Sequence, residues 1–99
     1  MKTNGKYILK GKRTVPEHDL MKWARWFETA ERHVANDYVG KIQVSTVFLG
    51  IDHSFSGGRP LLFETMIFGG KHDEYQKRYH TWEEAEKGHK MTLKLVKGY

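Results

Sequence analysis

Two runs of strand-forming residues constrain the fold of this 99-residue chain more than any other feature. Residues 41–50 (KIQVSTVFLG) are rich in β-branched and aromatic side chains, which favour strands. Residues 61–68 (LLFETMIF) are apolar on both faces except at Glu64 and Thr65, a pattern typical of a central strand. The connection 51–60 is rich in turn formers, so we expect a loop between the two strands.

A helix is predicted on each side of these strands. Before them, apolar residues recur at helical spacing, at Leu20, Trp23, Ala24, Phe27, Ala30 and Val34. This stripe predicts a helix over about 16–35. After the strands, Thr81 and Glu84 have the spacing of a capping box and predict a second helix over about 82–96, in which Gly88 is a weak point. Its buried side is expected to contain Trp82, Ala85, His89 or Thr92, Leu93 and Val96.

The remaining segments complete the predicted fold. Residues 6–15 are expected to form a strand or hairpin that adds to the sheet, with Pro16 in the first turn of the following helix. Residues 74–80 alternate enough for a third, shorter strand. The fold class is therefore α+β, a two-layer sandwich in which an antiparallel sheet of three to five strands packs with two helices. One domain spans 1–99, and residues 1–5 are expected to be flexible.

The net charge of +5 is concentrated at the two ends of the chain. Residues 1–13 contain five Lys or Arg and no acid, and residues 87–99 contain four Lys and no acid. The middle, 14–86, has eight bases against twelve acids, a balance of −4. A nucleic-acid-binding protein usually carries its excess charge along the face that docks. Weak nucleic-acid binding through the basic termini is therefore only an alternative.

Composition and spacing disfavour several kinds of chemistry. The chain has no cysteine, which excludes disulfides, thiol catalysis and cysteine-based zinc sites. The six histidines match no metal-binding spacing, and no serine lies in a Gly-x-Ser-x-Gly elbow, so we expect no metal, no cofactor and no serine nucleophile. No apolar run approaches the roughly 18 residues of a membrane helix, and no secretory signal is visible. We therefore expect a cytoplasmic protein without membrane contact.

Three ionisable residues in or beside the predicted strands are candidates for acid–base chemistry or binding. Asp52 and His53 follow the first strong strand, and Glu64 lies inside the apolar one. Burying an unpaired carboxylate is costly, so Glu64 must either face water or find a partner. The partners considered are Arg25, Arg32, His53 and Ser45. An ion pair between the sheet and the first helix is the structural interpretation, and a binding or catalytic role is the alternative.

Aromatic and basic residues provide a second, weaker signal. Trp26 lies at the margin of the first helical stripe, with Arg25 and Arg32 spaced by seven residues on the opposite flank. Such residues can stack a base and hold phosphate, but Trp26 can equally close the core or make a dimer contact. Arg59 follows one glycine pair, and a second pair lies about 26 Å away, beyond the 61–68 strand. The two glycine turns therefore cannot share a small ligand within one chain.

Five segments resemble those of a group of short, largely uncharacterised bacteriophage and prophage proteins. They are WARWFE (23–28), RHVA (32–35), VSTVFLGIDHSF (44–55), PLLFETMIFGG (60–70) and RYHTWEEAEKGH (78–89). Together they cover about half of the chain in the same order. The resemblance implies an accessory protein that acts inside a host bacterial cell, and it implies no particular activity.

These observations predict a binding protein without catalysis, which forms a homo-oligomer because the two-faced apolar strands need more cover than two helices provide. Its partner is expected to be a small anionic, nucleotide-like ligand or a host protein that it blocks. The predicted ligand-binding residues are Arg25, Trp26, Arg32, Asp52, His53, Arg59 and Glu64. The alternative is a hydrolase that uses Asp52, His53 and Glu64 on a phosphate-containing substrate.

Overall fold

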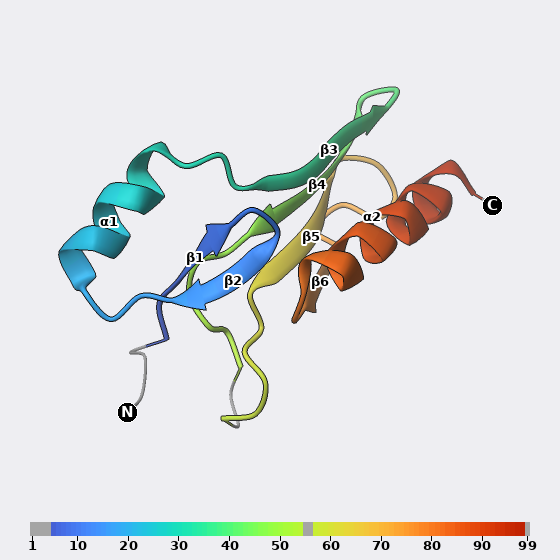
Figure 1. Ribbon diagram of the computed structural model, residues 1–99. Coiled ribbons are helices and arrows are strands. Elements are labelled where there is room, and N and C mark those ends of the chain that lie inside the picture. Colours follow the sequence, from blue (N-terminus) through green and yellow to red (C-terminus); the bar gives the residue numbers. More distant parts are fainter. Residues whose placement is uncertain (1–4, 55–56, 99) are drawn as a thin grey trace.

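A four-stranded antiparallel sheet forms the centre of the computed structural model, which describes residues 5–54 and 57–98 (Figure 1). The elements are β1 (Tyr7–Lys10), β2 (Arg13–Pro16), α1 (Leu20–Thr29), β3 (His33–Val39), β4 (Ile42–Phe48), β5 (Phe63–Phe68), β6 (Gln76–Tyr79) and α2 (Trp82–Lys97). Residues 1–5 are expected to be flexible, and four of them, 1–4, lie outside the described residues. Neither described helix combines the length and the apolar character that a membrane crossing requires.

The sheet has the strand order β3-β4-β5-β6, and every neighbouring pair is antiparallel. The prediction that the 61–68 run is a central strand is confirmed, because β5 lies between β4 and β6. The two strong strands pair from Gln43↔Phe68 to Phe48↔Phe63. The shorter third strand predicted over 74–80 is β6, and it forms one edge of the sheet.

All the other elements contribute to the cover of one face of the sheet. Side chains alternate along β4 and β5, so that Val44, Phe48, Phe63 and Ile67 are fully buried on this face. The helix α2 contacts all four strands on this face. Tyr7 and Leu9 of the β1–β2 hairpin and Trp26 of α1 pack against the same core around Phe48. The predicted two-layer α+β sandwich is therefore the observed architecture.

The first helix is shorter than predicted, and the prediction over 16–35 is wrong at both ends. Pro16 pairs with Tyr7 as the last residue of β2, and Asp19 becomes the N-cap because its carboxylate accepts the N–H groups of Met21 and Lys22. At the other end, Ala30 is extended. The chain then pairs with β4 as β3, an edge strand that the helical pattern concealed, because Val34 fits both periods.

The N-terminal hairpin forms as predicted but does not add to the main sheet. β1 and β2 pair from Tyr7↔Pro16 to Lys10↔Arg13 and make a separate two-stranded sheet. An isolated bridge joins Lys6 to Ile51. The hairpin covers the core around Phe48, because its Tyr7 and Leu9 pack against that core.

A series of hydrogen bonds, buried except at its Asp37 end, joins α2 to the sheet. The hydroxyl oxygens of Thr65 and Thr46 are 2.5 Å apart, and Thr46 Oγ1 is 2.7 Å from Nδ1 of His89. The other ring nitrogen, Nε2, is 2.8 Å from the Asp37 carboxylate on β3. A carboxylate only accepts, so Nε2 of His89 donates to Asp37. In the tautomer with its proton on Nε2, Nδ1 accepts from Thr46, and Thr46 accepts from Thr65. The prediction placed His89 or Thr92 on the buried side of the helix, and both are buried.

Gly88 of α2 lies directly against the ring of Tyr79. A β-carbon at this position would clash with the hydroxyl oxygen and Cζ of Tyr79. Tyr79 is itself 6% exposed, so its ring has little freedom to move away. The weak point of the predicted helix is therefore the contact at which α2 and β6 approach each other.

We predict that Gly88→Ala destabilises the protein by about 1–2 kcal/mol. At a helix interior this change normally stabilises by about 1 kcal/mol, because glycine loses more backbone entropy on folding. Here the overpacking against Tyr79, which typically costs about 1–3 kcal/mol, reverses the sign. Urea unfolding followed by circular dichroism measures the difference. The control Gly58→Ala, where a β-carbon meets nothing within 4 Å, stays near the wild type, and a stabilised Gly88→Ala variant would contradict the contact.

Candidate functional site

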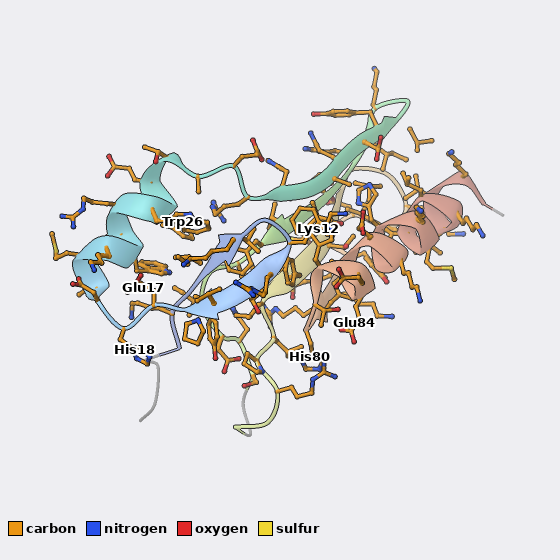
Figure 2. The ribbon with its side chains drawn as sticks, in the orientation of Figure 1. Lys12, Glu17, His18, Trp26, His80 and Glu84 are labelled. Atoms are coloured by element: carbon orange, nitrogen blue, oxygen red, sulfur yellow. The ribbon has the colours of Figure 1, made fainter. Side chains whose placement is uncertain are left out.

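The residues predicted from the sequence as one binding site, all within the described ranges, make no hydrogen bond or ion pair with one another, although Trp26 and Arg32 both contact Phe48. They are distributed over α1, the segment that leads to β3, the connection between β4 and β5, and β5: Arg25, Trp26, Arg32, Asp52, His53, Arg59 and Glu64. Arg25 and Arg59 are exposed. Figure 2 labels Trp26 on α1. No cluster of three or more His, Cys, Asp or Glu that could hold a metal occurs among the described residues.

Trp26 and Arg32 have structural contacts with the core. The ring of Trp26 meets that of Phe48 edge to face, with centroids 5.8 Å apart, which matches the core-edge alternative. Arg32 is not on α1, so the predicted seven-residue pairing with Arg25 on one helix is wrong. Its guanidinium lies 4.1 Å from the ring centroid of Phe27 and donates to the carbonyl of Phe48 at 2.9 Å. Both side chains therefore join α1 to the sheet.

Asp52 organises the connection between β4 and β5. Its carboxylate accepts the N–H of Ser54 at 2.8 Å, the hydroxyl of Ser54 at 3.0 Å and the N–H of Leu61 at 3.0 Å. Burial opposes ionisation of the Asp52 carboxyl, but these donors outweigh it and lower the pKa below 3.8. The neighbouring His53 ring bonds the carbonyl of Ile51 at 2.8 Å. Each of the two side chains is thus occupied by its own loop.

Glu64 finds its partner on the neighbouring strand. Nε of Arg78 on β6 donates to its carboxylate at 2.9 Å, and the side chain of Glu64 is 10% exposed. The expected ion pair between the sheet and α1 is wrong, because Glu64 stands directly opposite Arg78 in the β5–β6 register. By the alternation along β5, this pair lies on the face of the sheet that α2 does not cover.

His80 and Glu84 complete the start of α2, as Figure 2 shows. The carboxylate of Glu84 accepts the N–H of His80 at 2.9 Å, and the N–H of Glu84 donates to the hydroxyl of Thr81 at 3.1 Å. The predicted capping pattern is therefore confirmed. The His80 N–H, and more weakly the nearby positive charge of Arg59, lower the pKa of Glu84.

Asp37, His89 and Thr46 follow one another in the order of a carboxylate, an imidazole and a hydroxyl, as in hydrolases with a nucleophilic side chain. The Thr46 hydroxyl is nevertheless fully buried under α2, and His89 is 3% exposed. A substrate cannot reach that hydroxyl without the removal of α2. In this fold the three groups stabilise the interior.

A groove of about 590 Å3 runs between β6 and α2. Its walls include Tyr75, Lys77 and Tyr79 on the strand side and Lys87, Met91 and Leu95 on the helix side. Met91 is 64% exposed and Leu95 is 38% exposed, although both are apolar. This volume lies in the usual range of ligand sites, and it is the candidate site that we consider below as the β6–α2 groove.

The sequence contained a signal for this groove. The edge strand over 74–80 and the helix over 82–96 were both predicted, and Met91 and Leu95 are four residues apart on one helical face. They lie outside the set of residues expected to be buried, which leaves them as unexplained apolar positions. Their position beside Lys77 depends on the packing of α2 against β6, which a sequence pattern does not contain.

Asp52→Asn tests the structural role of the loop carboxylate. The folded-state pKa is below the unfolded value, so the stabilisation is fully present above about pH 4 and is lost as the pH falls through the lowered pKa. We expect the variant to be less stable than the wild type by about 1–2 kcal/mol near pH 7, and the gap to narrow towards about pH 2.5. Urea midpoints at both pH values measure this, with the exposed Glu28→Gln as the control. A gap that is independent of pH would contradict the assignment.

Known proteins add no functional identification to this geometry. No family model, no curated protein and no solved structure matches the chain. The resemblance to phage and prophage proteins therefore stays an expectation from the sequence, and the function has to be inferred from the site itself.

Proposed function

We propose that this protein acts by binding without catalysis, and that the β6–α2 groove holds a ligand that combines an anionic group with an apolar part. Such a ligand is either a small anionic molecule or an acidic segment of a host protein. The observation that supports this proposal is that exposed cations and exposed apolar side chains line the same groove. The phage-type sequence resemblance supports a setting inside a bacterial cell.

The charges of the groove favour an anion. Lys77 and Lys87 are exposed, and neither forms an ion pair with any residue in the described part of the chain. The carboxylate of Glu84, at one end, is already engaged by the N–H of His80. Arg78 is likewise paired with Glu64. Two lysines that form no ion pair with another described residue therefore line the groove.

The apolar surface of the groove favours a ligand with a hydrophobic part. Met91 and Leu95 expose more of their side chains than a residue in a packed helix face does, and Tyr75 lies across the groove from them. Covering apolar surface stabilises a complex by roughly 25 cal/mol per Å2. Methionine in addition adapts its shape to different ligands, which suits a binding surface.

The alternatives have less support. A hydrolase would need Asp52, His53 and Glu64 to share a substrate, but Asp52 is bonded to its own loop and Glu64 to Arg78. Nucleic-acid binding through the termini would need the basic ends to form one surface. Lys12 lies over the ring of Trp82 at the first residue of α2, and three acids, Glu83, Glu84 and Glu86, stand between Trp82 and Lys87, the first lysine of the C-terminal end.

Binding of 8-anilinonaphthalene-1-sulfonate tests the proposal, because this probe combines aromatic rings with one sulfonate. In a titration of 15N-labelled protein, we expect the largest amide shift changes at Lys77, Met91 and Leu95. Reversing both groove charges with Lys77→Glu and Lys87→Glu is expected to weaken binding by about tenfold or more, because an exposed ion pair contributes up to about 1 kcal/mol.

Lys90→Glu provides the matched control. It makes the same charge change on the same helix, at an exposed residue that does not line the groove. We expect its affinity for the probe to stay within about twofold of the wild type. Equal losses in Lys90→Glu and in the groove variant, or shift changes centred elsewhere, would contradict a site in the groove.

The homo-oligomer also remains a prediction. On the sheet face turned away from α2, Val47, Met66 and Phe68 carry apolar surface that no other described element packs against, and Phe68 is 44% exposed. Light scattering of the purified chain is expected to give a dimer or larger mass, and a monomer mass at working concentration would contradict it.

A further inference from the structure

We infer that the ligand of the β6–α2 groove is an extended acidic polypeptide segment, which adds to β6 as a fifth, antiparallel strand of the sheet. This inference rests on the proposed binding function and specifies its partner. Three properties of the groove carry it: the free backbone groups of β6, the length of the groove, and the order of its side chains.

The backbone of β6 presents hydrogen-bonding groups to an incoming strand. Ile67 donates to the carbonyl of Tyr75 at 3.1 Å, so Tyr75 faces β5. Because successive residues of a strand face opposite neighbours, Lys77 also faces β5, while the N–H and C=O groups of Gln76 and Arg78 point away from the sheet. β6 is an edge strand, so no further strand of the described chain meets these groups. They are the groups through which strand addition operates.

The groove has the length of a short extended segment. On the strand side it runs from Tyr75 to Tyr79, about 14 Å. On the helix side it runs from Glu84 to Leu95, about 16 Å. Four or five residues of an added strand span this distance, and α2 would lie over their groove-facing side chains.

The order of side chains along the groove specifies the segment. A residue opposite Lys77 points towards the groove together with Lys77, and a carboxylate there forms a favourable cross-strand pair. The residues two positions away on either side face Tyr75 and Tyr79, where Met91 and Leu95 provide apolar surface. The expected pattern is therefore apolar, any, acidic, any, apolar.

The same charges disfavour a second copy of this chain at this edge. Pairing β6 with β6 about a twofold axis at Lys77 would place two lysines directly opposite each other, which is destabilising. Lysine on an edge strand is one of the means by which proteins prevent such self-association. The positive charge of Lys77, which repels a second copy of this chain, attracts an acidic segment.

Hydrogen exchange with a designed peptide tests this inference. The probe is the capped heptapeptide Ser-Leu-Thr-Glu-Thr-Leu-Ser, which has the expected pattern. At saturation, we expect the amides of Gln76 and Arg78 to exchange at least about tenfold more slowly than in the free protein. The exchange rate of the Lys77 amide, which already faces β5, is expected to change little. Unchanged exchange at Gln76 and Arg78 would overturn strand addition.

N-methylation of the peptide gives a matched pair of controls. In the antiparallel register, the N–H groups of the two threonines point to β6, and that of the glutamate points away. Methylating a threonine nitrogen is expected to weaken binding by about threefold to tenfold, and methylating the glutamate nitrogen to leave it nearly unchanged. Equal effects would contradict the register.

The outcomes separate this inference from the proposed function. If the sulfonate probe binds in the groove and the peptide leaves Gln76 and Arg78 unprotected, the anionic site stands and strand addition is wrong. If neither probe moves the groove amides, the proposed function itself is wrong. Protection that rises with protein concentration in the absence of peptide would assign the edge to a second copy and overturn the acidic segment.

Discussion

The series of hydrogen bonds from Thr65 through Thr46 and His89 to the exposed Asp37 is the interaction on which the rest of the structure depends. It crosses from the central strand β5 to the edge strand β3 and includes one residue of α2. Thr65, Thr46 and His89 are buried and each has a hydrogen-bond partner, so the cost of removing these three groups from water is compensated only when α2 lies at one position on the sheet. This series of hydrogen bonds thereby fixes the orientation of α2 on the sheet, whereas apolar contacts alone would allow the helix to slide.

The position of α2 determines where the protein can bind. Gly88 allows the helix to approach β6 at the ring of Tyr79, and the residues beyond this contact, Met91 and Leu95, overhang the edge strand. The outcome is a groove with a helix on one side and unpaired strand backbone on the other. Apolar surface, lysine charge and backbone donors then lie within one short segment, which suits recognition of a polypeptide better than chemistry at a single atom.

The sequence predicts local structure here better than it predicts the site. The strands β4 and β5 and the capping pattern at Thr81 follow from side-chain type and spacing alone. The end of α1 does not, because Val34 fits a helix and a strand equally well and pairing with β4 decides between them. The partner of Glu64 depends on the β5–β6 register in the same way. Residues that looked functional in isolation, such as Asp52, proved to be bonded within their own loops.

The most direct test of the account is a nuclear Overhauser measurement on the complex with an apolar–acidic–apolar peptide. Because Lys77 faces β5, its α-proton points towards an added antiparallel strand, where opposed α-carbons are about 4.5 Å apart. We predict a strong contact between the α-proton of Lys77 and the α-proton of the peptide glutamate. Its absence at saturating peptide, or contacts from the peptide only to side chains of α2, would contradict strand addition at β6.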